Sequence, residues 1–515
     1  MSLSSKIPLV LMLAVVVVPL ATGMAAWFNS DLINKIYSRL AAAAVFLSML
    51  LAGGLYFFLE EGNPPVYILD LLPPLGLSLR LDYLSFYMIT LFTFLGFVVT
   101  WYSIKYTESD PRKGRLLSFM LFTLGGCYGV ALSGDFFTFY LFFEFMSLIY
   151  FMLLVHSQTE KALRAGFRFV FMAIVAGVSL FISLVIIYQE TGSLFFGEAG
   201  LLEETSTLAL AAFIGFVVAF GIKIALFPLH IWMPAAYAHA PLPAAFISSS
   251  IMLKTGAYGF LRAFGDVFGI SYLEAAGWEQ VLLYLALFTI VFGSVIALSQ
   301  DDIIRRLAYS GIAQMGYVLL GVSMLSEASF TGATFHLFAH AFMKGTLFLC
   351  AGVIIKGTGV RMISSMRGIG KGYPLVMACF GLASLTAVGM PPFNIFISKW
   401  YLFTGSFEQE MLFPVIVLLV SSFLNSCYYL PIVINAFWPG KEETEKTELQ
   451  ESVSMVAADS TVSSYPLRTL KLYLHDGVGH MLLPVFLLTA GCVIFNLLRV
   501  NWSLELVKTA LQGFF

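Results

Sequence analysis

The chain has 515 residues, of which 59% are hydrophobic and 11% charged, and its mean hydropathy is +0.89. Soluble globular domains carry about 25% charged residues. The composition therefore excludes a soluble domain and predicts an all-α polytopic membrane protein. The apolar runs lack the alternation of an outer-membrane barrel, and a net charge of −2 gives no electrostatic reason to expect nucleic acid as a partner.

The first apolar stretch, residues 7–28, is longer than the apolar part of a usual signal peptide, and only Lys6 precedes it. We therefore expect it to be the first spanning helix, retained in the protein. The cysteines lie in apolar stretches without a CxxC pair, which is typical of small buried side chains; they are Cys127, Cys350, Cys379, Cys427 and Cys492.

About fourteen apolar segments of bilayer length follow one another along the chain. They are residues 7–28, 40–59, 84–103, 116–132, 136–155, 167–188, 208–227, 244–264, 281–298, 303–324, 330–355, 375–403, 412–437 and 482–498. The only long polar stretch, residues 441–466, predicts a solvated connector before the last segment.

Lysine and arginine test this division into spans. Most of them fall in the loops after odd-numbered spans, and few fall in the loops on the other side. Because cytoplasmic loops carry an excess of Lys and Arg, the pattern predicts a protein of the cell (inner) membrane with both termini on the extracytoplasmic side.

Two of the predicted spans are interrupted by proline. Pro228 and Pro234 follow the seventh span, and Pro391 and Pro392 cut the twelfth. Proline removes a backbone donor and clashes one turn back, so each site predicts a broken helix. Paired broken helices are typical of transport paths built from two repeats. Their spacing of five spans predicts five-helix repeats, and an odd number of helices makes the two copies inverted.

Charged side chains within the spans are the candidates for chemistry. They are Glu144, Lys223, Lys254, Lys344 and Lys399. Each costs roughly 2.5–3.5 kcal/mol to insert, which a merely structural role does not require. Snorkelling of a lysine near a helix end is the alternative, and it fits Lys399 best. Burial and a nearby carboxylate shift a lysine's proton affinity in opposite directions, so we interpret Glu144 and Lys223 as a switchable pair.

The eleventh span carries His336, His340 and Lys344 at positions i, i+4 and i+8. These positions share one helix face and predict a proton relay over about 12 Å of rise. Plain core packing and a His–His metal pair are the alternatives, although no nearby acid or cysteine completes a metal site. His230 and His239 flank the first break and are candidates to connect the path to the cytoplasm.

At these residues the sequence resembles the antiporter-like subunits of Mrp-type sodium/proton antiporters, membrane-bound hydrogenases and respiratory complex I. The resemblance covers nearly the whole chain and is closest to the D-type Mrp subunit. The matching stretches are 223–234 (KIALFPLHIWMP), 239–243 (HAPLP), 300–317 (QDDIIRRLAYSGIAQMGY), 335–345 (FHLFAHAFMKG) and 389–400 (GMPPFNIFISKW).

The resemblance implies a fourteen-helix fold with inverted repeats formed by spans 4–8 and 9–13. It divides the chain into residues 1–105, a first repeat at 106–265, a second repeat at 266–438, and a polar loop with the last helix at 439–515. It also implies a relay made of Glu144, Lys223, Lys254, His336, His340, Lys344 and Lys399, where some family members have glutamate at the last position.

We therefore expect a proton-translocating subunit of a multisubunit membrane complex, with sodium as a further cation to be tested. It would lie in the lipid bilayer among other membrane subunits. No cofactor, metal or active site of its own is expected. The rival hypotheses are a non-conducting scaffold of a membrane redox enzyme and a self-contained transporter of a small organic solute.

Overall fold

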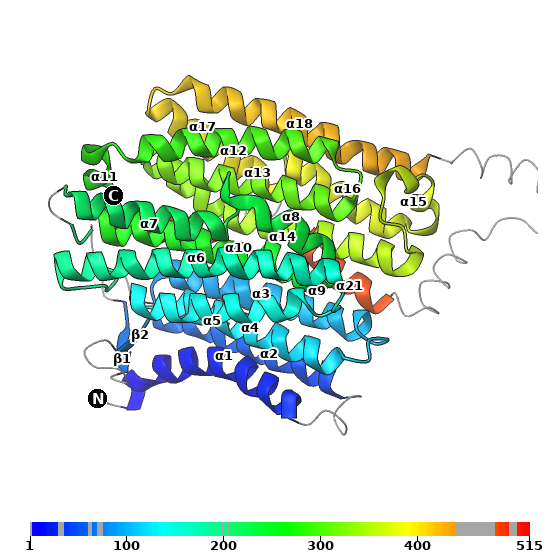
Figure 1. The fold of residues 1–515 in the computed structure, drawn as a ribbon, viewed down its shortest axis with the longest axis horizontal. Coiled ribbons are helices and arrows are strands. Elements are labelled where there is room, and N and C mark those ends of the chain that lie inside the picture. Colours follow the sequence, from blue (N-terminus) through cyan, green and yellow to red (C-terminus); the bar gives the residue numbers. More distant parts are fainter. Residues whose placement is uncertain are drawn as a thin grey trace, which may run out of the picture.

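The computed structural model describes residues 3–28, 36–59, 64–69, 76–197, 200–202, 205–438, 479–493 and 502–515. Its helices run side by side with their ends gathered at two opposite faces (Figure 1). Nine of the described helices are long and apolar enough to cross a membrane, and further apolar helices are shorter. The prediction of a polytopic all-α membrane protein is confirmed.

The first part of the chain forms long helices with short connections. They are α1 (Leu3–Phe28), α2 (Tyr37–Gly54) continued by η1 (Leu55–Phe58), α3 (Tyr83–Tyr106), α4 (Lys113–Leu132), α5 (Phe136–Leu154) and α6 (Glu160–Thr191). One feature was not predicted: β1 (Val66–Leu69) and β2 (Leu77–Arg80) pair as an antiparallel hairpin before α3. Aspartates cap α3 and α5: Asp82 accepts from the Ser85 amide at 2.8 Å, and Asp135 accepts from the Thr138 amide at 2.6 Å.

The seventh span is broken where the prolines predict it. It consists of α7 (Thr207–Lys223), the short η2 (Leu229–Trp232) and α8 (Met233–His239). The Trp232 indole donates to the Ile222 carbonyl at 2.8 Å, which satisfies a backbone acceptor at the break.

The eighth span is continuous but irregular. It consists of α9 (Leu242–Ile247), the π-helix η3 (Ser248–Met252) and α10 (Leu253–Arg262), and a second π-helix, η4 (Ala263–Phe268), continues the helix past the predicted end of the span at residue 264. π-Segments within α-helices are frequent at functional sites, and neither of these two was predicted.

The second part repeats the pattern of long helices and one break. Its elements are α11 (Ile270–Ala276), α12 (Glu279–Ser299), α13 (Ile303–Ser323), α14 (Glu327–Thr358), η5 (Ile363–Ser365), α15 (Ile369–Gly372), α16 (Pro374–Val388), α17 (Asn394–Glu408) and α18 (Leu412–Phe437). The break between α16 and α17 contains Gly389 in the left-handed region with φ 84°, and Pro391 and Pro392 follow it.

Each predicted span from the first to the thirteenth coincides with one of these helices or broken helices. The fourteenth coincides at its start with α21 (Gly479–Gly491), and α23 (Trp502–Leu511) follows it. The predicted polar loop 441–466 lies outside the described residues.

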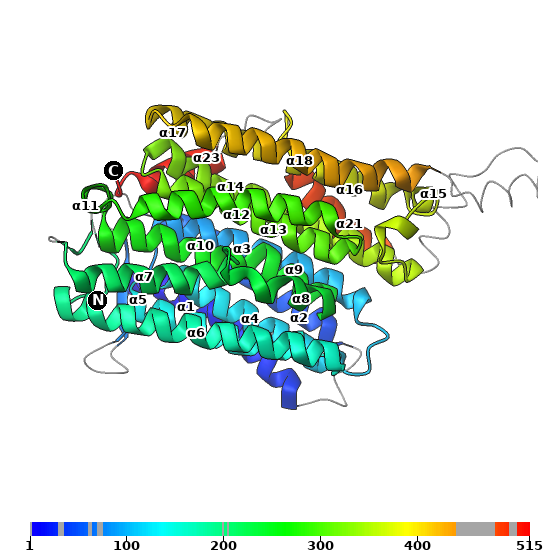
Figure 2. The same cartoon turned by 45° about the horizontal axis from the view of Figure 1, so that its top comes forward.

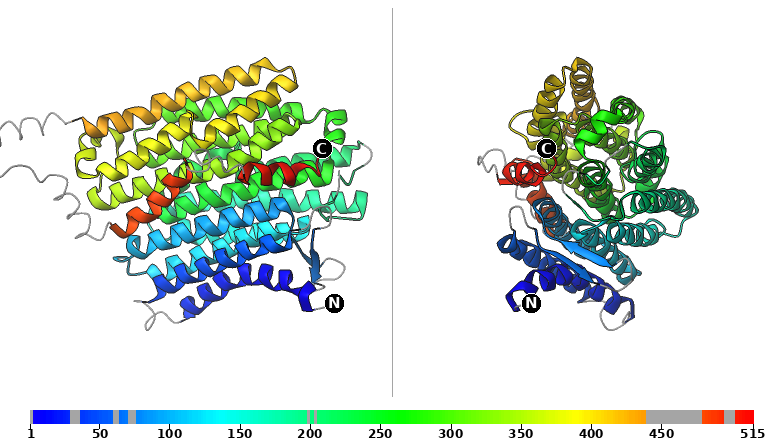
Figure 3. Two further views of the ribbon diagram at one scale, coloured as in Figure 1. Left: turned by 180° about the vertical axis from the view of Figure 1, so that it is seen from behind. Right: turned by 90° about the vertical axis from the view of Figure 1, so that its left-hand side faces the viewer.

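The bundle has α1 and α2 at one edge and α17 and α18 at the other (Figure 1), and in the turned view of Figure 2 α17 and α18 again lie along the top. Figure 3 shows α21 and α23 packed on the back of the bundle. The central helix is α14, which is buried from Ser329 to Ile354. The ionisable residues of the eleventh span therefore lie in the middle of the molecule.

Candidate functional site

The first part of the site joins α5 to the end of α7. Lys223 is the last residue of α7 and is 3% exposed. Its ammonium donates to the Ser147 hydroxyl at 2.5 Å and lies 4.3 Å from the centre of the Phe143 ring. Glu144 is one turn away from Ser147 on the same face of α5. Among the described residues no ion pair joins Glu144 to Lys223; the ammonium bonds Ser147, one turn after Glu144 on α5.

The Glu144 carboxyl group lies against α6. A Cβ atom at Gly177 would be 2.6 Å from its Cδ, so the missing side chain at Gly177 makes room for the carboxyl group. Its Oε1 is buried and has no hydrogen-bond partner among the described residues. Glu144 is only half-buried, and its α5 neighbours Phe145 and Leu148 face outward with exposures of 37% and 51%.

The second part of the site joins α10 to α14. Lys254 is fully buried. Its ammonium donates at 2.5 Å to the carbonyl of Ser249, a residue of the π-helix η3. Its Nζ is also 2.8 Å from Nδ1 of His340. Since an ammonium only donates, Nδ1 accepts from a charged Lys254, and Nε2 then carries the histidine proton.

His336 continues the row along α14. Its ring centre is 5.9 Å from that of His340, with 21° between the planes. Its Nδ1 is 2.8 Å from the Ser398 hydroxyl on α17, and its ring meets Tyr317 of α13 at 5.4 Å. Nε2 of each histidine is buried without a hydrogen-bond partner among the described residues.

Lys399 ends the row, one residue after Ser398 on α17. Its ammonium donates to the Val388 carbonyl at 2.8 Å and to the Ser422 hydroxyl at 2.7 Å. It also lies 5.3 Å from the centre of the Tyr317 ring. The carbonyl comes from the last residue of α16, so the second helix break supplies a direct ligand to this lysine.

Lys344 makes its hydrogen bonds with α13 and α18. Its ammonium donates to the Leu307 carbonyl at 2.8 Å, to the Ser310 hydroxyl, and to the Tyr429 hydroxyl at 3.1 Å. The relay residues implied by the resemblance lend themselves to a path from the histidines through Lys344 to Lys399, and these contacts do not match such an order. Lys344 therefore forms a side branch, bonded to α13 and α18 rather than to the histidines or Lys399.

The sequence interpretation missed the polar face of α13. Ser310 contacts Lys344 and Tyr317 contacts His336, so the intervening turn with Gln314 lies opposite the turn of α14 with His340. Both amide atoms of Gln314 are buried without partners among the described residues. The spacing of Ser310, Gln314 and Tyr317, which places them on one helix face, was the available signal.

A further hydrogen-bond network connects α13 to α18. The Tyr317 hydroxyl donates to Ser421 at 2.7 Å. Asn425 donates to Tyr317 at 3.4 Å and accepts from Tyr428. None of these α18 residues is charged, so a search for intramembrane charges overlooked them.

The histidines at the first break lie outside the row. His230 belongs to η2 and packs between Phe227 and Phe292, at ring distances of 5.5 and 4.9 Å. His239 ends α8. Within the described part of the chain, no contact links either histidine to the lysines.

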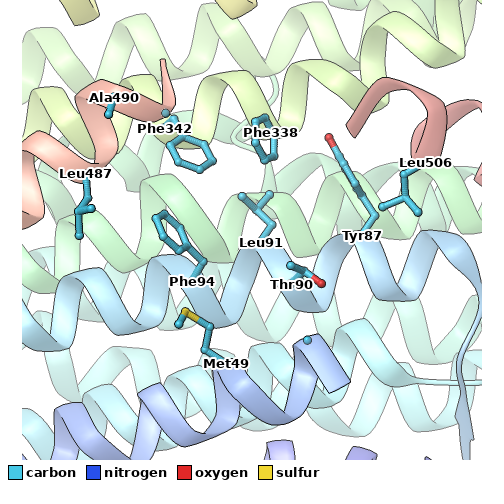
Figure 4. A pocket seen from close by; sticks show the side chains of 12 residues that line it. Met49, Tyr87, Thr90, Leu91, Phe94, Phe338, Phe342, Leu487, Ala490 and Leu506 are labelled. Atoms are coloured by element: carbon cyan, nitrogen blue, oxygen red, sulfur yellow. The ribbon is translucent and has the colours of Figure 1, made fainter. Parts of the chain in front are cut away.

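A cavity of about 490 Å³ lies on the other side of α14 (Figure 4). Its lining is almost entirely apolar and includes Phe338 and Phe342. These residues lie two positions after His336 and His340, which is about 200° around the helix. The cavity therefore faces away from the ionisable row, and its described lining offers no charged group to bind a solute.

These features define a polytopic membrane protein with a row of ionisable side chains through the centre of its helical bundle. The chain belongs to the NADH:quinone oxidoreductase/Mrp antiporter transmembrane family, which matches residues 133–425. Residues 74–116 also match the family of the complex I chain 5 N-terminus.

Two relatives show how similar the chain is to other proteins. The N-type subunit of NADH-quinone oxidoreductase from Desulforudis audaxviator is 34% identical over 438 residues, which cover 83% of this chain and 86% of that protein. The D-type subunit of the Na⁺/H⁺ antiporter from Alkalihalophilus pseudofirmus is 30% identical over 377 residues, covering 72% and 76%. The expected family membership is confirmed.

Solved structures share the fold over the whole chain. A chain of the Mrp complex from Dietzia sp. superposes with a TM-score of 0.81 at 22% identity, covering 100% of this chain and 98% of that one. A chain of respiratory complex I from Thermus thermophilus gives a TM-score of 0.77 at 22% identity, covering 98% and 100%.

Proposed function

We propose that this chain is the proton-translocating, antiporter-like subunit of a multisubunit membrane complex. The observation that carries the proposal is the row from Lys254 through His340 and His336 to Ser398 and Lys399. Its members are 0–3% exposed. Hydrogen bonds of 2.8 Å join Lys254 to His340 and His336 to Ser398, and the two histidine ring centres are 5.9 Å apart. Ionisable groups at membrane depth mark ion paths and proton relays, and histidine titrates near neutral pH.

The proposed relay consists of the seven residues that the resemblance implies, with Lys344 as a side branch: Glu144, Lys223, Lys254, His336, His340, Lys344 and Lys399. Protons would enter from the cytoplasm near Lys254, and Glu144 would control the charge of Lys223 through the Ser147 turn. Lys223 packs against α10 at Gly256, where a Cβ atom would be 2.7 Å from the Lys223 Cβ. This contact supports coupling between the two parts of the site.

The repeat organisation supports the same function. We assign residues 1–105 to the first three spans, 106–265 to the first repeat, 266–438 to the second, and 439–515 to the polar loop and last helix. Each repeat contains one broken helix with a lysine next to the break, Lys223 before the first and Lys399 after the second. We also propose a cell-membrane location with both termini outside, on the Lys/Arg pattern.

The exposure of Glu144 is an argument that another subunit covers the face formed by α5 and α6. A half-buried carboxyl group in the middle of a span is costly to leave facing lipid. Another membrane subunit over this face would remove that cost. Similar proteins are named as subunits of a sodium/proton antiporter and a quinone oxidoreductase, so we expect the driving reaction to belong to the partners.

The test is proton flux in sealed vesicles that contain the intact complex, followed with a pH-sensitive dye while sodium is varied. Lys223→Ala should abolish proton movement in an assembled complex, because no other described group replaces the ammonium at Ser147. Lys161→Ala, at an exposed position at the start of α6, is the matched control and should leave the flux unchanged.

The outcomes separate the rival functions. Flux that depends on sodium identifies an antiporter. Unchanged flux in Lys223→Ala would mean that ions cross through another subunit and that this chain is a scaffold. Uptake of an organic solute by the purified chain alone would favour a self-contained transporter and would refute the proposal.

A further inference from the structure

Four charged side chains gather at the end of the bundle that carries the β-hairpin. Arg262, the last residue of α10, donates from Nη2 to both oxygens of Asp82 at 2.7 and 2.8 Å. Its Nη1 is 3.2 Å from Asp266 in η4, and its Nε donates to the Tyr258 hydroxyl at 2.9 Å. Arg80 of β2 adds a bond to Asp82 at 2.9 Å. The relay described above uses none of these groups.

The two carboxylates are held very differently. Asp82 accepts both Arg262 bonds, the Arg80 bond and the Ser85 amide at 2.8 Å. Asp266 accepts one longer bond from Arg262. Since charge-assisted bonds strengthen as they shorten and become bidentate, Asp82 is fixed as the permanent counter-ion. Asp266 is the carboxylate that is free to change its charge.

A cavity of about 150 Å³ opens at this cluster. Arg80, Asp82, Arg262 and Asp266 line one part of it, and Thr509 and Phe514 from the C-terminal segment line another. A space of this size holds several water molecules, whose share of liquid volume is about 30 Å³ each. Asp266 is only 2% exposed, but it lines this cavity. The cavity is therefore the route by which water reaches its carboxyl group.

We propose that Asp266 is a proton-exchange site facing the extracytoplasmic solution, at which the carboxyl group releases its proton to water in the cavity and takes it up again. The ligand is a hydronium ion, and the step is a proton transfer between the carboxyl oxygen and a water molecule. Arginine keeps its proton, so Arg262 acts as a fixed charge that holds Asp266 at the cavity. This site rests on the proposed proton translocation and extends it.

The surrounding charges agree with this assignment. Asp266 lies beyond the eighth span, which the sequence predicts to end at residue 264. The pKa of Asp266 is raised to about 6, mainly because the carboxyl group is buried. The negative charge of Asp82 also raises it, whereas the positive charges of Arg262 and Arg80 lower it. Burial also acts on Asp82, but Arg262 and Arg80 outweigh it and hold the pKa of Asp82 below its ordinary value. A pKa raised above the ordinary range of a carboxyl group agrees with a group that exchanges its proton.

The same helix connects this site to the central lysine. Lys254, Tyr258, Arg262 and Asp266 follow at intervals of four residues, so Asp266 is about 18 Å along the axis from Lys254. Tyr258 donates to the Ala131 carbonyl at 3.3 Å and accepts from Arg262. The charge of Asp266 thus acts on the helix that presents Lys254 to His340.

The experiment measures proton flux by the intact complex in oriented vesicles, with cytoplasmic pH fixed and outer pH varied from 8 to 5. The wild-type rate should show an outer-side titration with an apparent pKa near 6. Asp266→Asn should remove this titration and lower the flux about 100-fold, the lower end of what a positioned proton-transfer group contributes. Asp266→Glu should keep the titration at a shifted pH.

Glu505→Gln is the matched control, because Glu505 is an exposed acid on the neighbouring α23. It should leave the outer-side profile unchanged. An assembled Asp266→Asn complex with the wild-type profile would overturn the proposal. If Lys223→Ala still abolishes flux in that case, the proposed function stands and only the outer site is wrong.

Discussion

Removal of the Arg262 guanidinium should destabilise the protein more than most single changes. Arg262→Met keeps the side-chain length and leaves Asp266 without a hydrogen-bonded cation, since Arg80 bonds Asp82 and not Asp266. Breaking a buried ion pair costs about 3–5 kcal/mol, and Arg262 and Asp266 are each 2% exposed. Because Asp82 keeps one partner, we expect the lower value, about 3 kcal/mol.

Such a loss corresponds to about 100-fold in an equilibrium or rate constant, since 1.36 kcal/mol is tenfold. The assay is the half-life of the folded complex at a fixed elevated temperature, read by size-exclusion chromatography, because membrane complexes of this size unfold irreversibly. The double variant Arg262→Met/Asp266→Asn should recover part of the half-life, since it also removes the unpaired carboxylate. A single variant within twofold of wild type would refute the reasoning.

Two further changes test neighbouring parts of the structure. Gly177→Ala should reduce proton flux without removing any ionisable group, because the new Cβ would lie 2.6 Å from the Glu144 Cδ and displace the carboxyl group; unchanged flux would show that its position is unimportant. At the opposite end of the bundle, burial lowers the pKa of His156, which bonds Asp110 at 2.8 Å. At pH values below about 6.5, the ordinary pKa of histidine, the unfolded state therefore binds more protons than the folded state. The free energy of unfolding should decrease as the pH is lowered. His156→Gln should flatten this loss between about pH 6.5 and 5, as measured by half-life against pH, and an unchanged slope would contradict it.

The sequence was sufficient to predict the membrane architecture because apolar length and proline are local signals. Thirteen predicted spans coincide with helices or broken helices, and the breaks lie where Pro228 and Pro391 place them. The intramembrane charges were equally visible, since each stands out against its apolar neighbours. Lys254 and His340 were both named, although only the fold shows that they touch.

The partners of these charges could not be predicted, because their identities depend on packing. Ser147, Ser398 and Ser422 are ordinary residues in a membrane helix, and their contacts with Lys223, His336 and Lys399 are not visible in the sequence. Arg262 meets Asp82 across 180 positions of sequence. A polar residue in an apolar span suggests that a contact exists, but only the tertiary structure identifies its partner.

Arg262 and Lys399 differ in the chemical type of their hydrogen-bond partners. Arg262 is neutralised by carboxylates, whereas Lys399 is bound by a carbonyl and by the Ser422 hydroxyl at 2.7 Å. Hydroxyl and carbonyl oxygens accept hydrogen bonds but carry no negative charge. The ammonium of Lys399 is therefore not fixed in its charged form by a bonded carboxylate.

A carboxylate placed beside Lys399 should therefore convert it into a fixed ion pair. Ser422→Asp should lower proton flux at least about tenfold, because a buried hydrogen-bonded pair resists separation by several kcal/mol. Ser422→Asn has nearly the same size and no charge, and it is the matched control in the same vesicle assay. Equal flux in the Asp and Asn variants of an assembled complex would mean that Lys399 does not change its charge during transport. A low flux in the Asp variant alone would show that it must.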